Sequence, residues 1–247
     1  MKYLNTPATD YKIALILALV ATSLTYGLAF LVGWITGVVF LEAAAVFTAY
    51  ACTYLCVRQR RWQYAVGMVS TILFALLFWQ VGLIASALLN VYLTIQLIYG
   101  WFRWGKDNET RPVTHVSWKM IPVYIIATVA MYFGGVWVLT AAGGALAGWD
   151  ILILLGSLLA QWLLDNKKIE TWYVWTAVNW IQIPVYFSIG LPLTAIQYVL
   201  FLGMNAWGWK AWNEDMQLDK VPADLYAEQQ KNDPEYITCT INLQGNT

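Results

Sequence analysis

The apolar segment 171–188 carries a row of aromatic and carboxamide side chains at helical spacing. Consecutive members are three or four residues apart, which places them on one face of an α-helix: Trp172, Trp175, Asn179, Gln182 and Tyr186. Indole faces attract cations, and carboxamides can hydrogen-bond amide and hydroxyl groups. The row therefore predicts noncovalent binding of a small molecule, and a flat cationic heterocycle would suit it.

Other roles are open for these side chains. Trp172 lies near one end of the segment, and tryptophan is common where a helix crosses the membrane interface. Asn179 and Gln182 lie deep in the segment, where amides can join neighbouring helices. An amide without a partner is costly in a membrane, so in either role these two should face protein or a water-filled cavity.

Four side chains in two other apolar segments are candidates for the same site: Asn90, Gln96, Tyr198 and Asn205. Asn90 and Tyr198 occupy equivalent positions in an internal repeat, and we expect both to face the centre of the protein. Gln96 lies about 120° around the helix from Asn90, so the two cannot both point straight into one pocket. A helix-to-helix hydrogen bond is the alternative role for Gln96 and Asn205.

Patterns typical of catalysis or metal binding are missing from the sequence. It has no histidine cluster, Cys-x-x-Cys motif or phosphate-binding glycine loop, and its single histidine, His115, falls in the predicted loop 103–118. Cys52 and Cys56 lie one helical turn apart in an apolar stretch and are interpreted as packing residues. We therefore predict no enzymatic activity, no cofactor and no metal.

Two carboxylates, Glu42 and Asp150, begin equivalent apolar segments and could couple transport to protons or ions. Their position allows a simpler role, because a carboxylate near a helix N-terminus offsets the helix dipole. No other side chain in the apolar segments is well suited to carry protons or Na⁺. We therefore expect facilitated diffusion rather than coupled transport.

The composition indicates an integral membrane protein. Of the 247 residues, 60% are apolar and 11% are charged, whereas about a quarter of the residues in a soluble domain are charged. The 14 basic and 14 acidic residues cancel, which argues against a nucleic-acid partner. A helix needs roughly 20 apolar residues to cross the bilayer. The sequence has eight runs of about this length: 12–33, 37–57, 63–81, 83–102, 119–140, 149–165, 171–188 and 191–211.

The lysines and arginines support the count of eight spans. All of them fall on one side of the predicted membrane: Lys2, Lys12, Arg58, Arg60, Arg61, Arg103, Lys106, Arg111, Lys119, Lys167, Lys168, Lys210, Lys220 and Lys231. Basic residues in short loops favour the cytoplasmic side. The distribution therefore predicts that both termini are cytoplasmic, and the N-terminal residues show no removable signal peptide.

The sequence resembles itself when it is shifted by 108 residues. Glu42 then falls on Asp150, and the Gly-Trp pair at 100–101 falls on the pair at 208–209. An even number of crossings separates the two units, so they run in the same direction, as in transporters built from parallel repeats. We predict an all-α transmembrane domain over 1–212, followed by an acidic cytoplasmic tail, 213–247. This domain holds an extra N-terminal helix, repeat one (37–104), a linker helix (119–140) and repeat two (149–212).

The segment from Trp149 to Trp212 resembles the second repeat of the PnuC family of bacterial vitamin-precursor transporters, and 41–104 resembles the first. The most specific features are Trp172-x-x-Trp175 with Asn179, and the Gly-Trp-x-x-Trp motif that ends the first repeat. The resemblance covers about 1–212. It implies a 3+1+3 arrangement related to SWEET sugar transporters, a homotrimer in the bacterial inner membrane, and passive uptake of nicotinamide riboside that a separate kinase traps inside the cell.

The resemblance leaves the substrate open. The family also has members for thiamine and riboflavin, and thiamine is likewise a flat cation. The family pattern implies asparagine at the positions of Gln63 and Ser70 and glutamine at that of Asn90, so this chain departs from it. Because a fold does not fix a function, a membrane receptor or a structural membrane protein is a further alternative.

Overall fold

The computed structural model describes residues 6–34, 40–80, 84–105, 111–141, 147–188 and 192–218. These residues form eight α-helices, with no strand beyond one isolated bridge between Thr114 and Lys168. The helices are α1 (Pro7–Leu31), α2 (Phe40–Val57), α3 (Gln63–Gln80), α4 (Ile84–Trp104), α5 (Ile121–Ala141), α6 (Ala147–Asp165), α7 (Thr171–Ser188) and α8 (Pro192–Leu218). The predicted all-helical membrane fold is therefore confirmed.

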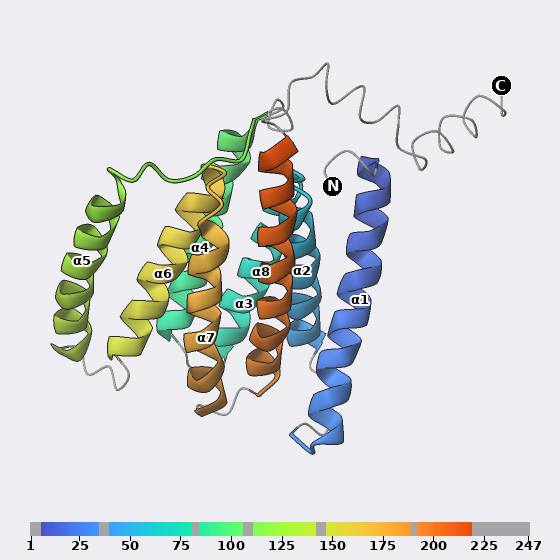
Figure 1. Ribbon diagram of the computed structural model, residues 1–247. Coiled ribbons are helices and arrows are strands. Elements are labelled where there is room, and N and C mark those ends of the chain that lie inside the picture. The colour runs from blue at the N-terminus through green and yellow to red at the C-terminus, as the bar shows by residue number, and fades with distance from the viewer. Residues whose placement is uncertain are drawn as a thin grey trace, which may run out of the picture.

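Six of the helices, which run alongside one another in Figure 1, form a closed ring through their contacts. Consecutive helices pack together within α2–α4 and within α6–α8, and contacts of α2 with α8 and of α4 with α6 close the ring. The described lysines and arginines all lie at the end of the bundle where α1, α3, α5 and α7 begin, which we call the basic end. The side chains that line the inside of the ring therefore come from both halves of the chain.

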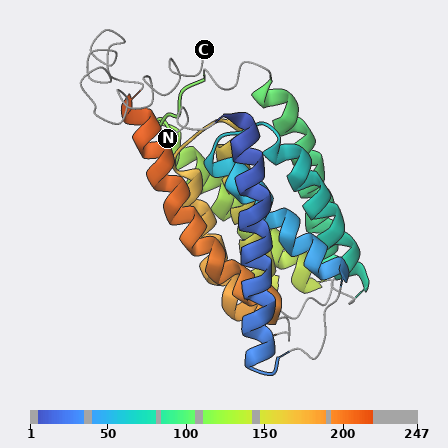
Figure 2. The ribbon, with the colours of Figure 1, turned by 90° about the vertical axis from the view of Figure 1, so that its right-hand side faces the viewer.

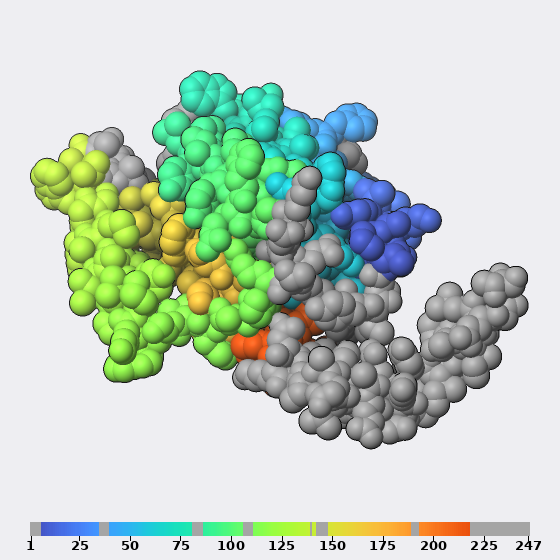
Figure 3. All heavy atoms as spheres, turned by 90° about the horizontal axis from the view of Figure 1, so that it is seen from above, coloured from blue at the N-terminus to red at the C-terminus, as the bar shows by residue number. Residues whose placement is uncertain are grey.

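Helices α1 and α5 lie outside the ring. The first helix, α1, packs against α2 and α8, and it approaches α8 most closely at the end opposite the basic end (Figure 2). Helix α5 packs against α6 at the edge of the molecule (Figure 3), and none of its described side chains is buried.

The two halves of the ring, α2–α4 and α6–α8, share the same type of turn at the basic end. Gln59 and Lys167, which are 108 positions apart, both have a left-handed backbone, with φ of 54° and 50°. In both turns the next amide donates to a carbonyl five residues back, from Arg60 to Leu55 at 2.8 Å and from Lys168 to Leu163 at 2.9 Å. This pattern is a common way to satisfy the last carbonyls of a helix.

The Gly-Trp-x-x-Trp motif has the same packing in both halves. Gly100 and Gly208 leave room for aromatic rings, because an added Cβ would overlap the ring of Tyr64 in one half and of Trp172 in the other. The last tryptophan of each motif covers that ring edge-on, with centroid distances of 5.2 Å for Trp104 and 5.4 Å for Trp212. The motif therefore packs the third helix of each half tightly against the second.

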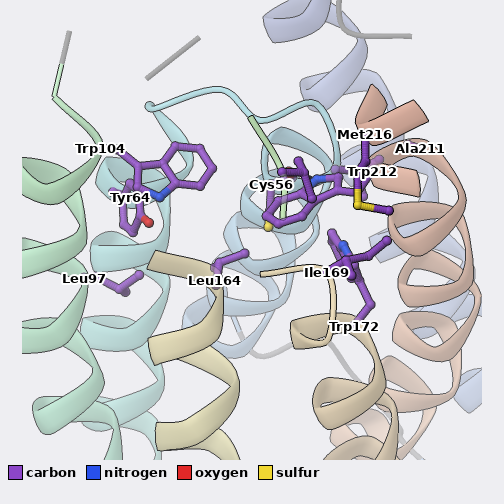
Figure 4. Packing of buried hydrophobic residues seen from close by; sticks show 12 residues of the cluster. Cys56, Tyr64, Leu97, Trp104, Leu164, Ile169, Trp172, Ala211, Trp212 and Met216 are labelled. Carbon is purple, nitrogen blue, oxygen red and sulfur yellow. The ribbon is translucent and has the colours of Figure 1, made fainter. Parts of the chain in front are cut away.

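The same two tryptophans also join the halves. The Trp104 indole donates to the Asp165 carbonyl of α6, and the Trp212 indole donates to the Cys56 carbonyl of α2, each at 3.2 Å. Both belong to a cluster of buried residues at the basic end, most of which Figure 4 labels. The two bonds therefore lie across the two ring-closing contacts.

Five helices, α1, α2, α3, α5 and α6, are long and apolar enough to span a membrane. The other three, α4, α7 and α8, have 21, 18 and 27 residues, and they carry many of the carboxamides that the sequence analysis selected. Most boundaries lie within a few residues of the predicted runs. The largest difference is α8, which ends at Leu218 rather than near 211.

The extension of α8 is part of the folded bundle. Asp215 is buried, and its carboxylate accepts a hydrogen bond of 2.7 Å from the Gln59 amide of the α2–α3 turn. Residues 213–218, which the sequence assigned to the acidic tail, therefore pack on the domain. The rest of that tail, 219–247, lies outside the described residues.

A buried ion-pair cluster holds α1 to the same turn. Asp10 is fully buried, and its two carboxylate oxygens accept hydrogen bonds from the guanidinium groups of Arg58 at 2.9 Å and Arg60 at 2.7 Å. Thr6 caps the helix just before it, accepting from the Thr9 amide at 3.3 Å. Because Asp10 is shielded from water, this contact fixes the position of α1 at the basic end.

Candidate functional site

A cavity of about 200 Å³ lies inside the ring. All six ring helices contribute to its lining, which includes Cys52 from α2, Thr71 from α3 and Ser157 from α6. A single water molecule needs about 10–15 Å³ of such space. The cavity therefore has room for a small organic molecule rather than only a few waters.

Eight of the nine side chains that the sequence selected line this cavity: Trp172, Trp175, Asn179, Gln182, Tyr186, Asn90, Tyr198 and Asn205. The row on α7 contributes five of them, because its spacing of three and four residues turns one helix face inward. Asn179 and Gln182 are 3% and 5% exposed. The proline at position 184 lies within the same stretch of α7 but is exposed, on the face away from the cavity.

Gln96 is the exception among the nine. It is not part of the cavity lining, and its amide points across the seam to the Leu158 carbonyl of α6 at 3.5 Å. This is the helix-to-helix role that the sequence left open. Asn205 combines both roles, because it lines the cavity and its amide reaches the Thr176 hydroxyl of α7 at 3.5 Å.

Aromatic rings line the cavity at the end away from the basic end. Tyr186 stacks on Tyr198 with a centroid distance of 5.4 Å, and on Phe78 at 6.0 Å. The Gln182 amide donates to the Tyr198 hydroxyl at 3.2 Å. Phe74 extends the stack to the cavity lining from α3. This wall is therefore flat and aromatic, with hydroxyl and amide groups at its edge.

A second aromatic layer lies at the basic end, where its side chains pack together (Figure 4). It includes Tyr64 and Trp172, and the Tyr64 hydroxyl donates to the Asp165 carboxylate of the other half at 2.8 Å. Arg111, from the segment before α5, donates to the Asp165 carbonyl at 2.7 Å. Burial lowers the pKa of Arg111, and the nearby Arg103 guanidinium lowers it further. Charged groups thus gather behind this layer and not inside the cavity.

Four polar atoms of the lining are buried and have no hydrogen-bond partner among the described residues. Two are donors, Nε2 of Gln63 and Nε1 of Trp172, and two are acceptors, Oε1 of Gln182 and Oε1 of Gln197. Buried polar atoms in native proteins are normally paired with protein, water or ligand. The cavity therefore offers two donors and two acceptors to whatever occupies it.

Sequence analysis missed several of the lining residues. Gln161 and Gln197 were not selected, although Gln161 shares a helix face with Ser157 and Asp165, which are four residues before and after it. Gln63 and Ser70 appeared only as departures from a family pattern. Cys52, interpreted as a packing residue, lines the cavity while its thiol contacts the Gln63 carbonyl at 3.3 Å.

Among the described residues, the cavity lining contains no aspartate, glutamate, lysine, arginine or histidine. Glu42 and Asp150, the two carboxylates considered for ion coupling, lie at the starts of α2 and α6 and are not part of the lining. Among the described residues, no group of three or more histidine, cysteine, aspartate or glutamate side chains could hold a metal ion. The cavity is thus equipped to bind a molecule noncovalently.

A ring of membrane helices around an uncharged, partly polar cavity defines a small-molecule transporter. More particularly, the chain belongs to the family described as the nicotinamide mononucleotide transporter, whose model matches residues 39–214. The match begins just before α2 and ends inside α8, so it covers the whole ring. Membership of this family, and a transport rather than an enzymatic role, were both expected from the sequence and are confirmed.

Individual relatives support the same assignment. The nicotinamide riboside transporter PnuC of Escherichia coli is 24% identical over 203 residues, which cover 70% of this chain and 84% of that protein. PnuC of Neisseria mucosa is 27% identical over 191 residues, covering 70% and 72%. The riboflavin/roseoflavin transporter RibM of Streptomyces davaonensis is 24% identical over 128 residues, covering 47% and 57%.

A crystal structure of the vitamin B3 transporter PnuC has the same fold. It superposes with a TM-score of 0.68 and 20% sequence identity, over 86% of this chain and 99% of that one. The likeness therefore extends well beyond the six ring helices.

Proposed function

We propose that this protein carries nicotinamide riboside across the bacterial inner membrane by facilitated diffusion, and that an intracellular kinase then traps the substrate. The observation that carries this proposal is the lining of the cavity: aromatic rings, unpaired amide groups and, among the described residues, no aspartate, glutamate, lysine, arginine or histidine. Nicotinamide riboside is a nucleoside with a cationic pyridinium ring, a carboxamide and ribose hydroxyls. Aromatic faces suit the cation, and the free donors and acceptors suit the polar groups.

The uncharged lining favours the riboside over the mononucleotide. A phosphate monoester carries about −1.5 to −2 charges at pH 7. Burying such a charge without a cationic partner is very costly, and the lining supplies no lysine or arginine. The mononucleotide, which the description of the family names, is therefore a poor fit to this cavity. The PnuC relatives are named as transporters of the riboside.

Riboflavin is the alternative, supported by the match to RibM. Two unpaired acceptors, on Gln182 and Gln197, favour a cationic or donor-rich ligand over the neutral flavin ring. Thiamine, also a cation, would meet the same groups. Measured affinities for nicotinamide riboside, riboflavin and thiamine would therefore distinguish these substrates.

We also propose that α2–α4 and α6–α8 are parallel repeats, that α5 links them, and that α1 is an addition. The equivalent turns at Gln59 and Lys167, and the equivalent glycine–aromatic contacts, support this division. Both termini are then cytoplasmic, with the basic end inside the cell. The assembly is a homotrimer, as the family resemblance implies, and native mass spectrometry would count its protomers.

Binding calorimetry on the detergent-purified protein tests the substrate. We expect saturable binding of nicotinamide riboside and none of the mononucleotide at the same concentration. Equal binding of the mononucleotide would overturn the charge argument, and tighter binding of riboflavin or thiamine would reassign the substrate. Proteoliposomes test the mechanism: uptake should stop at equilibrium, and accumulation driven by a pH gradient without internal kinase would refute facilitated diffusion.

The orientation has a separate test. Cysteines introduced at positions 82 and 190, between paired spans, should react with an impermeant maleimide from outside intact cells. A cysteine introduced at Lys119, on the basic side, should not react until the cells are permeabilised. The reverse pattern would place the basic end outside.

A further inference from the structure

A second hollow lies on the outside of the ring, between α1 and α8. This groove has a volume of about 460 Å³, and its walls are almost entirely apolar. Side chains from α1 form one wall, Leu200, Gly203, Met204 and Trp207 of α8 form the other, and Tyr50 of α2 lies at its floor. The Tyr50 hydroxyl is paired with Thr25 at 2.8 Å, so it offers the groove no free polar group.

The shape of the groove follows from the packing of α1. At the end opposite the basic end, α1 and α8 converge, where Leu193 packs with Tyr26 and Ala29. Toward the basic end the two helices diverge (Figure 2), and α1 stays attached to α2 through Asp10. The result is a wedge that faces the membrane and widens toward the basic end.

Two lysines lie just beyond the walls of the groove, at its wide end. Lys12 lies one helical turn before Ile16 of the α1 wall, and Lys210 lies one turn after Trp207 of the α8 wall. Both are exposed, and no ion pair joins either to another described residue. The nearby aspartates have other partners: Asp10 is buried against Arg58 and Arg60, and Asp215 accepts from Gln59. Glu214 lies one turn beyond Lys210 along α8.

We propose that this groove is a binding site for an anionic phospholipid. One acyl chain lies in the apolar wedge, and the phosphate of the headgroup lies between Lys12 and Lys210, at the level of Trp207. Basic residues at a membrane surface attract anionic lipids, and tryptophan favours the headgroup region. The site does not depend on which solute the central cavity carries.

Charge argues for a lipid rather than a second copy of this chain. A second copy in the same membrane would bring its own basic end to the same height, where the described lysines and arginines all lie. It would therefore add positive charge next to Lys12 and Lys210. An anionic headgroup neutralises both lysines while its chain covers the apolar walls.

Gly203 allows a variant that fills the groove without disturbing the fold, because an added Cβ there meets no atom within 4 Å. Gly203→Phe should block the wedge. Gly134→Phe on α5 is the matched control, since a Cβ at that exposed glycine also meets nothing. For charge, Lys12→Gln with Lys210→Gln is compared with Lys119→Gln, an exposed lysine before α5.

Native mass spectrometry of the purified protein, with phosphatidylglycerol or phosphatidylcholine of identical chains, counts bound lipids and protomers together. We expect the wild type to prefer phosphatidylglycerol by about 25-fold, about fivefold for each lysine. The double glutamine variant should lose this preference, Gly203→Phe should lose the bound lipid, and both controls should behave as wild type.

Three results would overturn the proposal. The first is a lipid preference that survives the double glutamine variant. The second is displacement of phosphatidylglycerol by inorganic phosphate alone, since that would mean that the groove contributes nothing. The third is a change in protomer number in Gly203→Phe with lipid binding unchanged, which would make the groove a contact between copies.

Discussion

Replacing Gln197 by leucine should weaken substrate binding and stabilise the empty protein at the same time. Gln197 is 2% exposed, lines the cavity and has an amide oxygen without a partner among the described residues. If the substrate supplies that partner, leucine removes one hydrogen bond from the complex. A hydrogen bond of this kind contributes about 0.5–1.5 kcal/mol, which corresponds to a loss of roughly two- to tenfold in affinity.

The effect on stability has the opposite sign. A buried polar atom without a partner costs about 1–3 kcal/mol, and leucine of similar volume removes that cost. Water can enter a polar cavity of this size and satisfy the oxygen in part. We therefore expect a gain near the lower limit, about 1 kcal/mol, seen as a rise in the Tm of the substrate-free protein.

Calorimetry and thermal unfolding in the same detergent measure the two quantities. Gln96→Leu is the control, because Gln96 also has an unpaired buried oxygen but lies outside the cavity lining. It should leave the affinity unchanged. If Gln197→Leu bound substrate as well as the wild type, or lost stability, the amide would have a structural partner and the assignment of its oxygen to the ligand would be wrong.

Three other predictions follow from the geometry. Asp10→Ala leaves two buried guanidinium groups without their carboxylate and should cost about 3–5 kcal/mol of stability, measured as a lower Tm. Gly208→Val should push the Trp172 ring out of its place, costing about 1–3 kcal/mol in overpacking and reducing uptake into proteoliposomes. Trp175→Ala and Asn179→Ala should each weaken binding in calorimetry while the elution volume in gel filtration stays the same.

Each of these has a result that would contradict it. An unchanged Tm in Asp10→Ala would mean that the ion-pair cluster adds nothing to stability. Gly134→Val on α5 is the control for Gly208→Val, because an added Cβ there meets nothing within 4 Å, and equal loss of uptake in both would exclude a specific role for the ring. Unchanged affinity in both alanine variants would mean that the row on α7 does not contact the substrate.

The helices and the row on α7 were predictable because each depends on local sequence. A run of apolar residues defines a membrane helix, and a spacing of three and four residues defines a helix face without knowledge of its neighbours. The outcome for Gln96 shows the limit of this reasoning. Its angle from Asn90 was correct, but only the position of α6 decides that this direction leads to a seam and not to the cavity.

The remaining site residues depend on contacts between distant parts of the chain. Sequence analysis selected Tyr198 because it is equivalent to Asn90 in the internal repeat, and it gave no reason to select the neighbouring Gln197. The two residues are about 100° apart on the helix, and both line the cavity. The end of α8 shows the same limit. Glu214 and Asp215 gave the segment the composition of a solvated tail, but Asp215 finds its partner, Gln59, 156 residues away.

Trp172 had two possible roles in the sequence analysis, one at the membrane interface and one in substrate binding. In the structure it belongs to the buried cluster at the basic end and also lines the cavity. Its ring lies over Gly208 and under Trp212, while its indole nitrogen has no partner among the described residues. Its counterpart Tyr64 is tied to Asp165 of the other half. The two halves therefore differ where the cavity meets the basic end: one aromatic ring is bound across the seam, and the other has a donor left for the substrate.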